Sequence, residues 1–158
     1  MSRPPGLRPK KATPPPQRGN MHPIDLTGLD HVVLRVSDLA LALQFYEEVL
    51  GCHIERRLDD IGLIQLRAGA SLIDLVPLDS PLGQAGGAGP GEDGRNVDHF
   101  ALALAQFEEP ALRAHLEAHG VLPGKVATRY GASGMGPSMY IRDPDGNTVE
   151  LKGPPVDD

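Results

Sequence analysis

The sequence has a single cysteine, Cys52, and no apolar run approaching the ~20 residues that a membrane-spanning helix needs. One cysteine excludes an internal disulfide framework and fits a reducing compartment, so we expect a cytoplasmic protein. The lack of a long apolar run argues against an integral membrane protein. The content of hydrophobic residues, 40% of 158, is ordinary for one compact globular domain.

Acidic residues are absent from residues 1–20, which hold five of the 15 lysines and arginines and many prolines. Proline blocks helix formation and this composition leaves little to bury, so residues 1–24 are predicted to be a disordered basic tail. The rest of the chain keeps 10 basic residues against all 21 acidic ones, which argues against a nucleic-acid surface. A single folded domain is expected over residues 25–158, with a small molecule as its partner.

One order of elements is predicted twice in this domain. The segment 29–78 begins with the β-branched run "LDHVVLRV", continues with a helix that Ser37 and Asp38 cap and Gly51 ends, and closes with three strands. A glycine-rich connector, 79–96, leads into 97–153, which repeats strand, helix and three strands. The repeated pattern predicts an internal duplication.

The duplication superposes chemically similar residues. "LDHVVL" lies over "VDHFAL" and "LIDL" lies over "TVEL", which places His31 over His99 and Asp74 over Glu150. Because strand side chains alternate between two faces, Asp30 and Asp98 are expected to point away from the histidines that follow them. If the first and last strands of both units surround one axis, two imidazoles and two carboxylates meet there.

Such a set suits one divalent transition metal, and Zn, Ni, Mn, Co and Fe(II) all fit it. Without a metal, four inward polar groups would cost several kcal/mol in desolvation. The competing interpretation for Glu150, which lies between Val149 and Leu151, is a carboxylate that faces solvent.

The segments "LDHVVLRVSDLALALQFYEEVLG" (29–51), "VDHFALAL" (97–104) and "MYIRDPDGNTVEL" (139–151) resemble the vicinal oxygen chelate superfamily, most closely glyoxalase I-like proteins. The resemblance implies an α+β fold in which two βαβββ modules form an open, cupped mixed sheet around a metal, usually with help from a dimer. It also implies metal ligands at four positions: His31, Asp74, His99 and Glu150. Glutamate is usual at the second position, so Asp74 is one methylene shorter.

A Lewis-acidic metal with a neighbouring carboxylate suits proton transfer next to a carbonyl or hemithioacetal, as in a glyoxalase-type lyase. Glu150 is the expected base, and Asp74 is the second catalytic carboxylate. Arg35, Tyr140 and Arg129 are the expected substrate contacts, and Arg35 matches a position that holds the glutathione carboxylate in glyoxalase I. Leu78 stands where that family has a glutathione-contacting asparagine, which weakens the glutathione interpretation.

Two alternatives stay open. "MYIRDPDGNTVE" fits the end of the extradiol dioxygenase signature, and His31, His99 and Glu150 would form its iron(II) triad, but Gly131, Ala132 and Ser133 stand where its histidine is expected. A metal-free binding protein of bleomycin-resistance type would use the same cup to sequester a small molecule.

Two loop predictions complete the picture. "TRYGASGMGPS" (128–138) has three glycines and is expected to form a mobile flap beside the cup. "DPDG" (143–146) is explained by turn chemistry, because Pro144 presets φ and Gly146 accepts a positive φ.

Overall fold

The computed structural model describes residues 26–156, so the predicted tail lies outside the described residues. The first module comprises β1 (His31–Val36), α1 (Leu39–Gln44), the π-helical turn η1 (Phe45–Val49), β2 (His53–Leu58), β3 (Leu63–Ala68) and β4 (Ser71–Pro77). A short helix, α2 (Pro81–Ala85), lies in the connector. The second module comprises β5 (His99–Ala103), α3 (Glu109–Ala118), β6 (Ala127–Gly131), β7 (Gly134–Arg142) and β8 (Thr148–Lys152).

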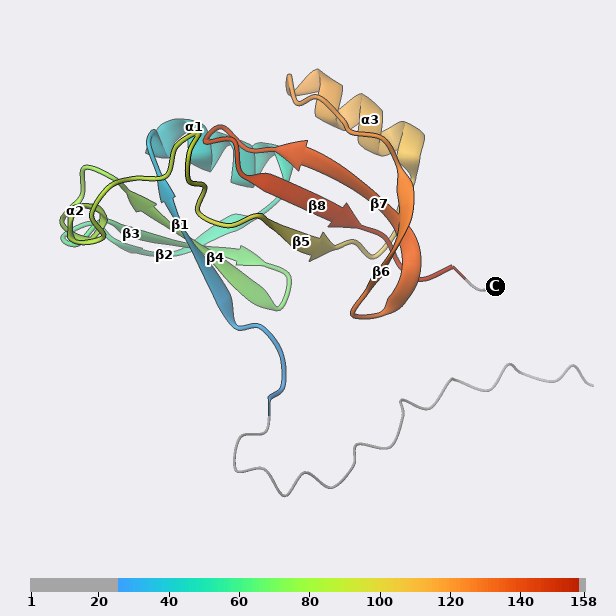
Figure 1. The fold of residues 1–158 in the computed structure, drawn as a ribbon, viewed down its shortest axis with the longest axis horizontal. Coiled ribbons are helices and arrows are strands. Elements are labelled where there is room, and N and C mark those ends of the chain that lie inside the picture. Colours follow the sequence, from blue (N-terminus) through green and yellow to red (C-terminus); the bar gives the residue numbers. More distant parts are fainter. Residues whose placement is uncertain (1–25, 157–158) are drawn as a thin grey trace, which may run out of the picture.

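The two modules have the same topology. Their strand orders are β1-β4-β3-β2 and β5-β8-β7-β6, and in each the first and last strands pair in parallel while the other pairs are antiparallel. Figure 1 shows the two sheets side by side, with α1 and α3 along the same side of the molecule. The predicted α+β fold of two βαβββ modules is confirmed.

A single apolar core joins both modules on the helix side of the sheets. It takes Leu34, Ile73 and Leu75 from the first sheet and Ile141 and Val149 from the second, all at most 2% exposed. Each fully buried aliphatic side chain of this kind contributes about 1.5–3 kcal/mol. The alternate residues of the same strands face the other way, and that face carries the predicted site.

The helix predicted after Asp38 is confirmed, with one difference. The Asp38 carboxylate accepts from the Leu41 backbone N–H at 3.0 Å, and Gly51 ends the segment with φ of 72°. Its second half winds as a π-helix from Phe45 to Val49. Among residues 26–156, no helix is long and apolar enough to cross a membrane.

The predicted flap at 128–138 was wrong, because this segment forms the β6–β7 hairpin. Tyr130 pairs with Met135 and Gly131 with Gly134 around a tight turn. Gly134 has φ of 120°, a conformation that favours glycine, and a Cβ on Gly136 would come within 2.4 Å of the Pro154 carbonyl. The glycines here permit turning and close approach within an ordered sheet.

The modules are joined by a buried network at the β7–β8 turn. The Tyr46 hydroxyl of η1 donates to the Asp143 carboxylate at 2.8 Å, and both residues are at most 5% exposed. Asp143 also accepts from the backbone N–H of Asn147 at 2.7 Å and from its side-chain amide at 2.8 Å. Gly146 has the expected positive φ of 79°, but turn chemistry alone does not explain "DPDG", because its first aspartate holds two modules together.

A second group of contacts extends this joint to the end of β1. The Asn96 side chain accepts from the Arg35 backbone N–H at 3.1 Å and donates to the Arg35 carbonyl at 3.0 Å, while also donating to Asn147 at 3.2 Å. Asp145 accepts from the backbone N–H of Ser37 at 2.9 Å and from its hydroxyl at 2.5 Å. The end of the connector and the β7–β8 turn are therefore both bonded to the end of the first strand.

Replacing Tyr46 with Phe should lower the free energy of unfolding by about 1–3 kcal/mol, because the buried Asp143 carboxylate loses a donor. Urea denaturation would measure the change. The matched control is Tyr130→Phe, since Tyr130 is 80% exposed and should tolerate the change within about 0.5 kcal/mol. If both variants had the same free energy of unfolding, the Tyr46–Asp143 hydrogen bond would not contribute the stability expected here.

Candidate metal and substrate site

The four predicted ligands occupy equivalent positions in the two modules. In each, the acid pairs across the parallel strands with the residue two positions after the histidine: Val33 with Asp74, and Ala101 with Glu150. Histidine and acid therefore lie on one face of each sheet, opposite the core. We call His31 and Asp74 the first pair, and His99 and Glu150 the second pair.

Each histidine is hydrogen-bonded to the aspartate that precedes it. His31 Nδ1 donates to Asp30 at 2.6 Å, and His99 Nδ1 donates to Asp98 at 2.6 Å. The prediction that these aspartates point away was wrong. Both precede the first residue of the strand, so the alternation of strand side chains does not apply to them. The hydrogen bond to Asp30 raises the pKa of His31 above its usual value.

Because a carboxylate only accepts, Nδ1 carries the proton in both rings and a neutral ring presents the lone pair of Nε2. A carboxylate that orients a histidine in this way is a common partner of metal-ligating imidazoles. Both rings are thus prepared to ligate through Nε2.

Glu150 lies beside His99 and is only 6% exposed, which excludes the solvent-facing interpretation. Its Oε2 is 3.5 Å from His99 Nε2. A cation placed between this lone pair and the carboxylate oxygen would be attracted by both. Two ligands at metal distances of about 2.1 Å and a tetrahedral angle stand about 3.4 Å apart, so the second pair fits a metal.

Asp74 in the first pair is 3% exposed and incompletely bonded. Its Oδ2 accepts from the Gln65 amide at 3.0 Å, whereas Oδ1 is buried without a hydrogen-bond partner. An unsatisfied buried carboxylate oxygen costs free energy that a bound cation would offset. Sequence reasoning missed Gln65, whose signal was a lone amide in the apolar strand "LIQLRA", directly opposite Asp74.

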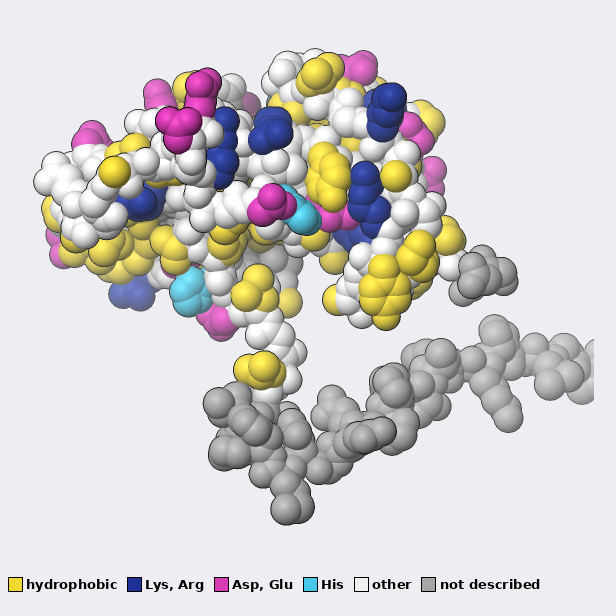
Figure 2. Space-filling model, in the orientation of Figure 1, with side chains coloured by type: hydrophobic (Ala, Val, Ile, Leu, Met, Phe, Trp, Pro, Cys, Tyr) yellow, Lys and Arg dark blue, Asp and Glu magenta, His cyan; other side chains and the backbone are white. Residues whose placement is uncertain are grey.

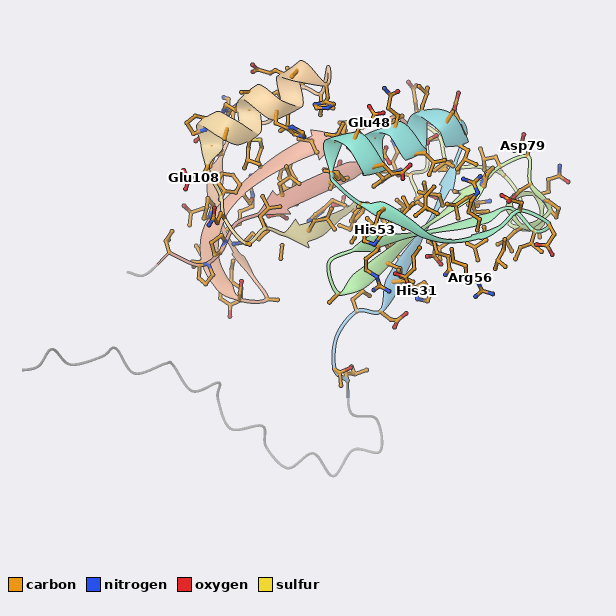
Figure 3. The ribbon with its side chains drawn as sticks, turned by 180° about the vertical axis from the view of Figure 1, so that it is seen from behind. His31, Glu48, His53, Arg56, Asp79 and Glu108 are labelled. Atoms are coloured by element: carbon orange, nitrogen blue, oxygen red, sulfur yellow. The ribbon has the colours of Figure 1, made fainter. Side chains whose placement is uncertain are left out.

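The two pairs do not meet within one chain in this structure. No group of three or more His, Cys, Asp and Glu side chains within residues 26–156 is close enough to hold a metal ion. Figure 3 shows His31 on the strand that follows the N-terminal segment, with the second module on the other side of the view. Each pair supplies two donors, so a four-donor site requires the pairs to be brought together.

Two of the predicted substrate contacts lie next to the second pair. The Tyr140 ring meets the His99 ring edge to face, with centroids 5.5 Å apart. The Arg129 guanidinium stacks over Tyr140 at 4.5 Å from the ring centroid and donates to the Ser138 hydroxyl at 2.6 Å. Tyr140 also pairs with Glu150 across β7 and β8, so these side chains share one face.

Arg35 shares the face of His31, but its guanidinium is bonded to the connector. It donates to the carbonyls of Gly86 at 2.9 Å, Gly87 at 3.2 Å and Ala88 at 2.9 Å. A role in binding a substrate anion stays a prediction, and these bonds would have to be exchanged for it.

Two other features lie away from the pairs. Burial raises the pKa of the Cys52 thiol to about 11, which fits a core residue and not a nucleophile. A cleft of about 840 Å³ lies between α1 and η1 on one side and the end of α3 on the other, and includes Leu41, Phe45 and Leu122. Tyr140 lines it, but no member of either pair does.

Residues 28–151 match the Glyoxalase/Bleomycin resistance protein/Dioxygenase superfamily. The chain belongs to this superfamily. Among curated superfamily relatives, Virulence protein STM3117 of Salmonella typhimurium is 32% identical over 128 residues, which cover 78% of this chain and 81% of that protein. A solved integron cassette protein from the mobile metagenome of V. Cholerae is 30% identical with a TM-score of 0.63, covering 82% of this chain and 97% of that one.

A third relative carries a named activity. Catechol-2,3-dioxygenase of Bacillus subtilis is 26% identical over 126 residues, which cover 79% of this chain but 41% of that enzyme. The chain thus spans less than half of this relative. Superfamily membership fits a divalent metal and a small molecule, while the activity of this chain is a separate question.

Asp74→Asn should leave the metal-free protein at least as stable as the wild type, because the variant loses an incompletely bonded buried charge. The same change should weaken Zn²⁺ binding by about tenfold or more. Thermal unfolding with and without ZnCl₂ measures both effects. The control is Asp79→Asn, an exposed connector residue. If ZnCl₂ stabilised Asp74→Asn as much as it stabilises the wild type, Asp74 would not be a metal ligand.

Proposed function

We propose that this chain is a divalent-metal-dependent enzyme of glyoxalase type, a lyase or isomerase that moves a proton next to a carbonyl or hemithioacetal in a small oxygenated substrate. The observation that supports this most directly is Glu150, a carboxylate 6% exposed on a strand face, 3.5 Å from His99 Nε2. A binding protein that only encloses its ligand has no need of a histidine and an acid at equivalent positions in both modules.

The residues have distinct roles in this proposal. His31, Asp74, His99 and Glu150 would hold one divalent metal, which when bound polarises a substrate oxygen and makes the neighbouring C–H more acidic. Glu150 accepts and returns the proton, since a buried carboxylate beside the reacting carbon is a suitable general base. Asp74 is held by Gln65 and has the shorter side chain, so it serves chiefly as a ligand. Tyr140 and Arg129 contact the substrate beside His99.

An extradiol dioxygenase is the second candidate, favoured by the Bacillus subtilis relative and by Tyr140 next to His99. That reaction uses an acid/base histidine near residues 131–133, and this position is the tight β6–β7 turn without a histidine. Metal analysis of protein purified without chelator separates the two, because bound iron would favour the dioxygenase.

We further propose that two copies of the chain share the metal site, with the first pair of one copy facing the second pair of the other. The pairs are separate within one chain, and both histidines are partly exposed, His31 by 47% and His99 by 40% of their side chains. They lie on β1 and β5, each at the edge of its sheet, with Val33 47% exposed beside His31. A homodimer would cover these edges and complete the ligand set.

Glu150→Gln should fold normally but lose activity by orders of magnitude, since the amide keeps the size of the side chain and removes the proton-accepting oxygen. Metal affinity should also fall, by about 10 to 100-fold. Conversion of methylglyoxal hemithioacetals, tested with glutathione and with other small thiols, and metal content by elemental analysis are the measurements. A suitable control is Glu48→Gln, an exposed acid on η1. Normal turnover and metal content in Glu150→Gln would exclude Glu150 from the site.

The shared site is tested by co-expressing His31→Ala with His99→Ala. In a mixed dimer one of the two shared sites keeps all its ligands, so random pairing should restore about a quarter of the wild-type metal capacity, whereas each variant alone binds weakly. Equilibrium dialysis against Zn²⁺ is the measurement. Mixed samples no better than the separate variants would place all four ligands in one chain.

A further inference from the structure

Lys152 is a buried cation on the face that carries the second pair. It follows Glu150 by two residues on β8, so both side chains lie on the same side of the sheet, about 7 Å apart along the strand. The residue is only 6% exposed. Its ammonium donates to the Gly153 carbonyl at a long 3.3 Å, and none of the ion pairs found within residues 26–156 includes it.

Two glycines make room for this side chain. A Cβ on Gly131 would come within 3.1 Å of Lys152 Cε, and one on Gly136 within 2.9 Å of its Nζ. Gly131 and Gly136 lie on β6 and β7, the two strands that follow β8 across the sheet. The strands thus leave a recess in which the ammonium lies over the sheet.

A lysine that only covers apolar surface usually extends its ammonium to water. Lys152 does not, and burying an unpaired ammonium costs several kcal/mol. Packing of the lysine methylene stem would explain why two glycines make room for it. It would not explain why the ammonium is buried without an acidic partner. A ligand that carries negative charge would account for both.

The surroundings of Lys152 add a second cation and a hydroxyl. Ser138 is fully buried and lies directly opposite Lys152 across β7 and β8. Arg129 donates to the Ser138 hydroxyl, whose own O–H stays available. The two acids near this recess, Glu150 and Asp98, both lie against His99, so neither is paired with Lys152. Figure 2 shows acidic side chains next to a histidine on the second module, with Lys and Arg side chains beside them.

We infer that Lys152, Ser138 and Arg129 form an oxyanion subsite that holds a carboxylate or a phosphate-like group of the substrate. This rests on the proposed function and deepens it by naming the substrate class: a small molecule that carries an anionic group near the carbon that reacts beside Glu150. Lysine supplies the point charge, while Arg129 and Ser138 supply directed donors, a combination suited to an oxyanion.

The test compares wild-type protein with Lys152→Met, which keeps the stem and removes the charge. Isothermal titration with acetate and with inorganic phosphate distinguishes a carboxylate site from a phosphate site, and acetamide is the neutral probe of the same shape as acetate. Wild-type protein should bind one of the two anions saturably and acetamide not at all. Lys152→Met should weaken that binding at least tenfold, and Lys125→Met, an exposed lysine of the same module, should not change it.

Removing a buried charge should not unfold the protein, and a thermal melt of Lys152→Met checks this. Titrations are made on metal-free protein, and Zn²⁺ binding is measured separately. Metal binding without anion binding, or equal anion binding by Lys152→Met, overturns the subsite and leaves the proposed function standing. Anion binding that depends on Lys152 in a protein that binds no metal supports the subsite and contradicts the proposed metal enzyme.

Discussion

The contact on which the arrangement of the modules depends is the buried hydrogen bond between Tyr46 and Asp143. It joins the helical segment of the first module to the turn between β7 and β8 of the second. Asp143 at the same time fixes Asn147, at the start of β8, and Asn147 bonds to Asn96, which holds the backbone of β1. The Asp143 carboxylate therefore links η1 of the first module to β8 through Asn147, and to β1 through Asn147 and Asn96.

Within each ligand pair the acid and the histidine are held differently, because they lie on different strands of the sheet. Asp74 and Glu150 lie on β4 and β8, which have a neighbouring strand on each side. His31 and His99 lie on β1 and β5, each of which has a neighbouring strand on one side. The carboxylates are therefore fixed by the sheet, whereas the histidines are placed where another module can approach.

Periodicity and repetition in the sequence were enough to predict the order of helices and strands along both modules, and they predicted that each histidine shares a sheet face with the acid of its module. These features depend on local patterns and on strand alternation, which the sequence displays directly. The role of Asp143 was not predictable in the same way, since its partner Tyr46 is 97 residues away and "DPDG" has a sufficient local explanation. The hydrogen bonds of the Arg35 guanidinium were not predictable either, because they depend on where the connector folds back. The hairpin at 128–138 was missed because glycines signal flexibility in a sequence, although here they supply clearance.

That clearance also limits how this protein can change over evolutionary time. A side chain at Gly136 would collide with both the Lys152 ammonium and the Pro154 carbonyl, and one at Gly131 would press on the lysine stem. A side chain at Gly136 is therefore excluded by the Pro154 carbonyl whatever residue stands at position 152, whereas a side chain at Gly131 requires only a small shift of the flexible lysine stem.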